Sequence, residues 1–140
     1  MGQDHVHPIL WLTPRMLKTY GLRKMLHAKI NWEGVKIHSE AHHEWAHNPI
    51  LVKKAVAIAQ ELHVPMLIHT GNFTVSKANV FEYLYQEFPK QTFVLAHGRP
   101  LNQVLAIMSK YPNVIVDTAF MPVEDIRELI SRVSSSAFQI

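Results

Sequence analysis

Short apolar runs alternate with longer amphipathic segments along this chain, which is typical of strands and helices that take turns. Each run is mostly apolar and does not alternate strictly with polar residues. This indicates parallel strands that are buried on both faces. The runs predict five strands, at residues 8–13, 34–39, 65–70, 92–97 and 113–118.

The segments between the runs predict helices with recognisable ends. Asn48 and Pro49 supply an N-cap and a proline at the first helical position, and Ser76 is expected to cap the next helix. A segment after Thr13 and Pro14 is a weaker helix because Gly21 interrupts it. The apolar positions recur at helical spacing in four stripes: Val52, Ala55, Val56, Ala59 and Leu62; Val80, Phe81, Leu84, Tyr85 and Phe88; Leu101, Val104, Leu105 and Met108; Ile126, Leu129, Ile130 and Val133.

Repeated strand and helix units of this length predict an α/β fold with parallel β/α repeats, whose sheet is either open or closed into a barrel. A complete TIM (β/α) barrel needs about 250 residues. The chain has 140 residues, enough for one core, with 48% apolar content. We therefore expect residues 1–140 to form one partial β/α-barrel domain of about five units, with residues 1–7 disordered or artificially added; a free-standing five-unit domain is the alternative.

Composition narrows the function classes. No apolar run reaches the length of a membrane helix, and the first residues lack a secretion signal, so we expect a cytoplasmic protein without membrane partners. Cysteine is absent, so a metal would bind to His, Asp or Glu side chains. The net charge of +3 is scattered, which argues against nucleic acid.

Ten histidines are the unusual feature, because imidazole is the commonest metal ligand and titrates near neutrality. Polar side chains lie at or near the carboxyl ends of four predicted strands, where parallel α/β proteins build their sites: Lys36 and His38, His69, His97, and Asp117. If these strands are neighbours, the three imidazoles converge within reach of one divalent ion, with zinc the best match. The alternative for each histidine is a hydrogen-bonded structural role.

The same strand ends carry a resemblance to a known family. The segments GVKIH (34–38), PMLIHTG (65–71), LAHGRP (95–100) and NVIVDT (113–118) resemble consecutive strands of the amidohydrolase superfamily, in the branch of metal-dependent hydrolases and related decarboxylases. The resemblance covers nearly the whole chain from Pro8. It implies that the strands are roughly the third to the seventh of a β/α barrel.

The resemblance also implies roles for individual residues. His69 is similar to a metal ligand, and His97 to the catalytic histidine that binds metal or activates water. Lys36 and His38 stand where the family contacts substrate and sometimes metal. Asp117 is expected to be an inward-facing structural group that supports the metal ligands, and not the catalytic acid. Arg99 is a candidate for holding a substrate carboxylate, with an exposed salt bridge as the alternative.

The chain departs from the family pattern in two places, since neither the first-strand His-x-His pair nor the eighth-strand aspartate is found. His5-Val6-His7 imitates the pair, although only four residues precede it; a disordered or added terminus is the preferred interpretation. The histidine-rich segment 40–47 follows the 34–39 strand. It either covers the site mouth, with His43 and His47 on one helical face, or forms a solvated loop pinned by its aromatic residue.

These observations leave several functions open. The first is a metal-dependent hydrolase acting on a small-molecule amide, ester or carboxylate, with a decarboxylase-type lyase using the same parts. The second is a catalytically incomplete barrel fragment that acts as a structural module and forms homo-oligomers through its open sheet edges. A metal nuclease is least favoured, because phosphate-binding basic residues are not clustered.

Overall fold

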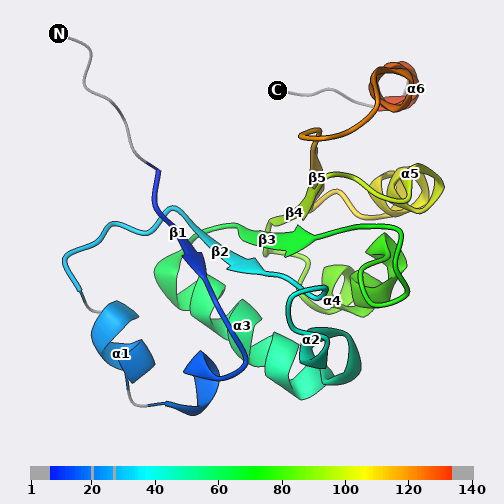
Figure 1. Cartoon of the computed structure of the whole chain (residues 1–140). Helices are drawn as coiled ribbons and strands as arrows, with labels where there is room; N and C mark the ends of the chain where they lie inside the picture. The colour runs from blue at the N-terminus through cyan, green and yellow to red at the C-terminus, as the bar shows by residue number, and fades with distance from the viewer. Residues whose placement is uncertain (1–6, 20, 27, 134–140) are drawn as a thin grey trace, which may run out of the picture.

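The computed structural model describes residues 7–19, 21–26 and 28–133 (Figure 1). Strands and helices alternate along these residues in the predicted manner. The elements are β1 (Ile9–Trp11), the 3-10 helix η1 (Met16–Lys18), α1 (Gly21–Leu26), β2 (Gly34–Ile37), α2 (Glu44–His47), α3 (Pro49–Leu62), β3 (Met66–His69), the 3-10 helix η2 (Ala78–Phe81), α4 (Glu82–Glu87), β4 (Phe93–Ala96), α5 (Leu101–Lys110), β5 (Val114–Asp117) and α6 (Val123–Val133).

All five predicted strands form, each shortened at its ends, and they make one parallel sheet in the order β1-β2-β3-β4-β5. The register aligns their carboxyl ends: Trp11 pairs with Lys36, His69 with Ala96, and Ala96 with Asp117. The sheet is open in the described part of the chain, with β1 and β5 at its edges. The expected α/β fold, a partial β/α barrel, is therefore confirmed.

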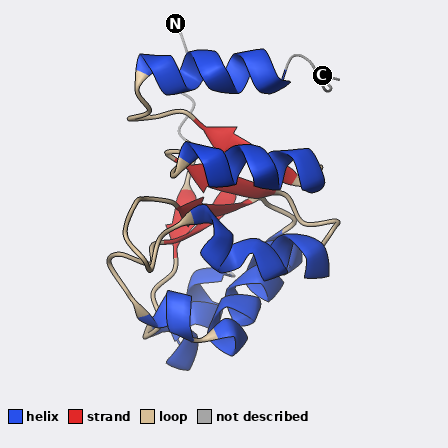
Figure 2. Ribbon diagram, turned by 90° about the vertical axis from the view of Figure 1, so that its right-hand side faces the viewer, coloured by secondary structure: helices blue, strands red, loops and turns tan. Residues whose placement is uncertain are grey.

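One face of the sheet forms the core, and the described residues leave the other face without a covering layer. Helices α3, α4 and α5 gather on one side of the strands, and Figure 2 shows the helices stacked in a row alongside them (Figures 1 and 2). The strand residues on that side are fully or nearly fully buried: Leu10, Val35, Ile37, Met66, Ile68, Phe93, Leu95 and Val114. Alternate residues point the other way and keep solvent contact, including Trp11 and Ile115, which are each 50% exposed. In contrast to the expected burial of both faces, only one face is covered.

The helix that begins at Pro49 has the predicted start. The side chain of Asn48 accepts a hydrogen bond of 3.1 Å from the backbone N–H of Leu51, and this satisfies one of the free donors of the first turn. The helix ends at His63, whose left-handed backbone lets its N–H donate to the carbonyls of Ala59 and Gln60. Four of the five predicted stripe residues, Val52, Ala55, Val56 and Ala59, have no solvent exposure.

Two predicted helices differ in the structure. Ser76 does not cap a helix, because its hydroxyl donates to a glutamate of another loop, and the segment beyond it forms η2 followed by the short α4. The segment after Pro14 divides into η1 and α1. Thr19 is extended (φ −115°, ψ 146°) between the two helices, near the predicted break at Gly21.

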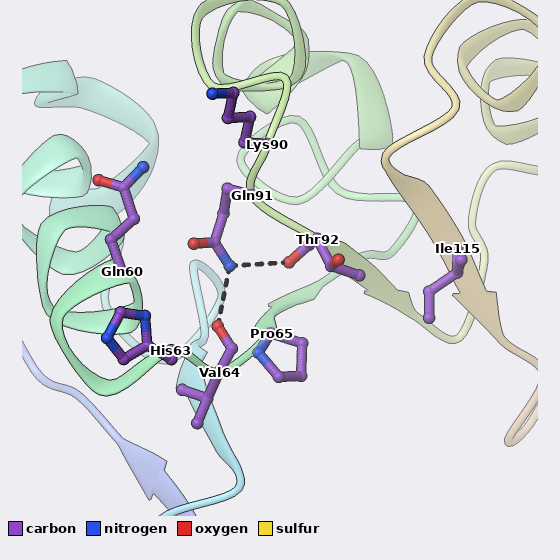
Figure 3. A pocket seen from close by; sticks show the side chains of 8 residues that line it. All are labelled: Gln60, His63, Val64, Pro65, Lys90, Gln91, Thr92 and Ile115. Atoms are coloured by element: carbon purple, nitrogen blue, oxygen red, sulfur yellow. Dashed lines mark hydrogen bonds between the residues drawn. The ribbon is translucent and has the colours of Figure 1, made fainter.

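The amino edge of the sheet is stabilised by the buried amide side chain of Gln91. Gln91 donates to the carbonyls of Val64 and Thr92 and joins the loops before β3 and β4 (Figure 3). A cavity of about 510 Å³ lies here, lined by Gln60, His63, Val64, Pro65, Lys90, Gln91, Thr92 and Ile115. Because the Gln91 amide is occupied by backbone carbonyls, this edge has a structural role.

Among the described residues, every helix is too short or too polar to span a membrane.

Candidate functional site at the carboxyl edge

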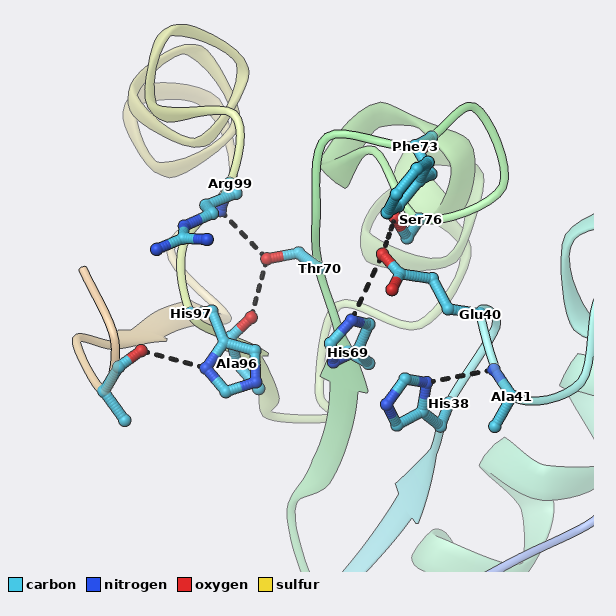
Figure 4. Close-up of polar contacts among 11 residues, drawn as sticks. His38, Glu40, Ala41, His69, Thr70, Phe73, Ser76, Ala96, His97 and Arg99 are labelled. Carbon is cyan, nitrogen blue, oxygen red and sulfur yellow. Dashed lines mark hydrogen bonds and ion pairs between the residues drawn. The ribbon is translucent and has the colours of Figure 1, made fainter. Parts of the chain in front are cut away.

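Three imidazole rings lie in a row at the carboxyl edge of the sheet, from β2 to β4 (Figure 4). The ring centroids of His38 and His69 are 3.7 Å apart and their planes are 13° from parallel. His69 and His97 meet edge to face at 5.0 Å and 71°. The structure therefore brings together the three histidines that the strand ends predict.

Aromatic rings continue the row at both ends. Trp11 stacks on His38 at 5.9 Å, and Phe120 lies 5.5 Å from His97. The Lys36 ammonium group lies 6.0 Å from the Trp11 ring centroid, at the limit of a cation–π contact. Lys36 thus sits beside the row on the uncovered face, at the β1 end.

The hydrogen bonding of His38 sets its proton position. The backbone N–H of Ala41 donates to His38 Nδ1 at 3.3 Å, so the neutral ring carries its proton on Nε2. Burial, together with the neighbouring His69 and Lys36, lowers the pKa of His38 to about 4, although Glu40 opposes part of this shift. His38 is thus a neutral hydrogen-bond donor near pH 7.

The ring of His69 is held by a carboxylate. His69 Nε2 lies 3.3 Å from Oε1 of Glu40, and the His69 side chain is only 13% exposed. Its other nitrogen, Nδ1, is buried without a hydrogen-bond partner. Burial lowers the pKa of His69, although Glu40 opposes this shift, so the ring is neutral near pH 7.

The position of His97 depends on a sharp turn after β4. His97 and Gly98 have φ angles of 71° and 52°, which direct the chain toward the β5 loop. His97 Nδ1 donates to the carbonyl of Ala119 at 2.9 Å, and Asp117 accepts from the Ala119 N–H at 3.0 Å. Asp117 therefore supports His97 through the backbone of this turn, and His97 Nε2 retains a free lone pair.

Arg99 is attached to the same edge by two contacts. Its backbone N–H donates to the Thr70 hydroxyl at 3.0 Å, and that hydroxyl donates to the Ala96 carbonyl at 2.7 Å. The Arg99 guanidinium donates to the carbonyl of Phe120. One nitrogen is thereby committed to the backbone, and the remaining donors of the fork can bind a carboxylate.

A cavity of about 550 Å³ opens over this row. It is lined by Glu40, His69, Thr70, Gly71, Asn72, Phe73, His97, Arg99 and Phe120. Three of the predicted site residues, His69, His97 and Arg99, line it. The sequence analysis did not assign Glu40 or Ser76 to the site; the available signal was the spacing of Glu40, two residues after His38.

Among the described residues, the other histidine-rich segments add no ring to the row, although segment 40–47 contacts it through Glu40 and Ala41. His7 is at the amino end of β1, where its Nδ1 pairs with Glu33 at 2.5 Å, so it does not imitate a pair at the carboxyl edge. His5 and Val6 are outside the described residues. His43 and His47 are exposed around α2, whereas Trp45 is 1% exposed. The segment is thus pinned by its tryptophan.

The residues fit a divalent metal only in part. His69 Nδ1 is buried without a hydrogen-bond partner, and the bond from His97 Nδ1 to Ala119 leaves the His97 lone pair on Nε2, so these two atoms are suited to bind an ion. His38 does not fit as the expected third ligand. Its stacked ring holds the Nε2 proton, and in-plane lone pairs of parallel rings do not converge. Within the described residues no group of three candidate side chains could hold an ion, so metal binding requires ligands in addition to these two.

Comparison with known proteins agrees with the fold and with the strand-end pattern. A family model described as Amidohydrolase matches residues 15–137, which is most of the chain. No curated protein and no solved structure matches. Strands β2 to β5 and the row of histidines all lie within the matched range. The chain belongs to the amidohydrolase family.

Proposed function

We propose that this chain forms part of a metal-dependent hydrolase that acts on a small-molecule amide, ester or carboxylate. The observation that carries the proposal is the adjacent pair of rings, His69 and His97, at the carboxyl edge, in which His69 Nδ1 is buried without a partner and His97 is hydrogen-bonded through Nδ1. Family membership supports a hydrolase. Zinc suits imidazole ligands, and the ligands that complete the site come from outside the row.

The roles of the chain's own residues follow from their hydrogen bonds. His69 and His97 would hold the metal, which supplies an acidified water and a polarised carbonyl. His38 Nε2–H donates to a substrate oxygen, and Lys36 contributes a positive charge at the same end. Arg99 binds a substrate carboxylate with its free donors.

Zinc binding tests the proposal directly. We expect purified protein to bind zinc, and His69→Ala or His97→Ala to weaken binding by at least about tenfold, since removing a ligand costs no less than removing a supporting group. His47→Ala is the matched control, because His47 is exposed on α2. Chelation should abolish hydrolysis of small esters or amides, and added zinc should restore it. Zinc affinity unchanged in both variants would overturn the proposal.

Decarboxylation is the runner-up reaction, because it needs the same residues. Arg99 then orients the carboxylate that leaves as carbon dioxide. The carbon atom that loses this carboxylate receives a proton in its place. Release of carbon dioxide from a carboxylate substrate, without hydrolysis of esters or amides, would favour this reaction.

The uncovered sheet face favours a second candidate, a self-associating module without catalytic activity of its own. Ile9, Trp11 and Ile115 are exposed there, and in the described part of the chain the edge strands β1 and β5 have no further strand beside them. Burying this face against a second copy removes apolar area from water. Strictly monomeric sedimentation at high micromolar concentration would exclude this candidate.

A further inference from the structure

The carboxylate of Glu40 occupies a site that is built around it. Oε1 accepts a hydrogen bond of 2.6 Å from the Ser76 hydroxyl and faces His69 Nε2 at 3.3 Å (Figure 4). The side chain is only 28% exposed. Burial raises the pKa of Glu40, but the Ser76 hydrogen bond and the nearby His69 outweigh it and hold this pKa below its usual value. Two polar groups, the Ser76 hydroxyl and His69 Nε2, therefore converge on Oε1 of Glu40.

Gly71 leaves the room that this carboxylate needs. A Cβ atom at Gly71 would lie 2.3 Å from Glu40 Oε1 and 2.8 Å from Ser76 Oγ, so either group would have to move. The Gly71 N–H donates to the Ser76 carbonyl at 2.9 Å and closes the loop that carries the serine. The loop after β3 is therefore shaped around a carboxylate from the loop after β2.

The contact with Glu40 determines which nitrogen of His69 is free. A carboxylate only accepts hydrogen bonds, so Nε2 must donate, and a neutral imidazole has a single ring proton. The lone pair then lies on Nδ1, the buried atom without a partner. The other neutral tautomer, with its proton on Nδ1, would leave Nε2 facing the acceptor Oε1 of Glu40 without a proton to donate.

We propose that Glu40 is a positioning residue, held by Ser76 and admitted by Gly71, that fixes the ring proton of His69 on Nε2 and presents Nδ1 as the binding atom. The use of Nδ1 rests on the proposed metal-dependent function. The proton position is a property of the chain itself and is tested without metal.

Nuclear magnetic resonance of the ¹⁵N-labelled histidines in metal-free protein tests the proton position. We expect a slowly exchanging ring proton on His69 Nε2 in the wild type. Glu40→Met, which keeps the side-chain length and removes the acceptor, should lose this signal. Gly71→Ala should lose it too, by displacing a carboxylate that is still present. Glu44→Met, on the exposed start of α2, is the control and should keep it.

The outcomes separate this inference from the proposed function. A ring proton on Nδ1 in the wild type, or an unchanged Nε2 proton in both variants, would overturn the role of Glu40. If Glu40→Met fails to fold, Gly71→Ala and Ser76→Ala provide the same comparison. We also expect Glu40→Met to weaken zinc binding by about 10- to 100-fold. If the wild type binds no zinc but shows the Nε2 proton, the metal proposal fails while Glu40 still positions His69.

Discussion

Two consecutive residues after β4, His97 and Gly98, have positive φ angles, which are costly for a residue with a side chain. His97 accepts this conformation because its ring gains the hydrogen bond to Ala119. At Gly98, a Cβ atom would also lie 2.4 Å from Met121 Cε and 2.9 Å from Val116 Cγ1. The turn that aims the catalytic candidate therefore depends on a glycine.

We expect Gly98→Ala to lower the free energy of unfolding by at least roughly 1 to 2 kcal/mol, the cost of a left-handed backbone at an alanine. Urea denaturation measures the loss. Gly34→Ala is the control, since its Cβ would lie 2.8 Å from the side chain of Ile9, without a positive φ. Equal losses for the two variants would show that crowding, and not the backbone angle, dominates at Gly98.

The sequence predicted which residues meet at the site but not how they are hydrogen-bonded. His38, His69 and His97 could be placed together because parallel strands put their carboxyl ends at one edge. The proton positions depend on the Ala41 and Ala119 backbones and on Glu40, which loops bring into place. Loop geometry has no periodic signal, so the strand pattern alone could not predict these hydrogen bonds.

At the scale of single elements, the start of α3 is the clearest case of sequence determining structure. We expect Asn48→Ala to lower the free energy of unfolding by about 1 kcal/mol, because the Leu51 N–H loses its acceptor. Asn48→Asp keeps an acceptor oxygen and should restore stability. Thermal or urea denaturation of the three proteins measures both effects, and a fully stable Asn48→Ala would contradict the capping role.

A second element-scale prediction concerns pH. Glu82, at the start of α4, accepts hydrogen bonds of 3.0 Å from Lys110 Nζ and the Tyr111 hydroxyl at the end of α5. These bonds lower the pKa of Glu82. A carboxyl pKa that is lower in the folded state makes stability largest above the unfolded value and reduces it as the pH falls through the folded value.

We therefore expect Glu82→Gln to be less stable than wild type at pH 7 and the difference to shrink below about pH 4.5, the usual glutamate range. Urea denaturation between pH 3 and pH 7 measures this. Glu61→Gln, on the exposed side of α3, is the control and should track the wild type across the series. A gap between Glu82→Gln and wild type that stays constant with pH would contradict the argument.

The sequence predicted elements well where a local signal was strong and less well where a distant partner competed. Apolar runs located all five strands, and Asn48 with Pro49 located the start of α3. Ser76 has the chemistry of a cap, yet its hydroxyl bonds to Glu40, 36 residues away. A capping residue with a charged acceptor nearby bonds to that acceptor, and single-sequence patterns do not reveal such contacts.

At the scale of the whole molecule, helices cover one face of the sheet, and the described residues leave the other face uncovered. The strands were predicted to be buried on both sides because their runs are almost continuously apolar. The side without helices nevertheless exposes Ile9, Trp11 and Ile115. The partly buried Lys36 and His69 lie on the same side. That face is therefore as apolar as the inward-facing side of a barrel's strands, which other side chains cover. The described residues do not supply such a cover.

Self-association through this face makes a definite prediction. We expect the wild type to form oligomers at micromolar concentration and Ile115→Lys to shift it toward monomer, because a charge on β5 would be buried in the contact. Ile50→Lys is the matched control: Ile50 is 72% exposed on α3, which lies on the helix-covered side of the sheet. Sedimentation velocity of the three proteins distinguishes the faces. Oligomers that persist in Ile115→Lys and dissociate in Ile50→Lys would place the contact on the helical side and remove the argument from the open sheet.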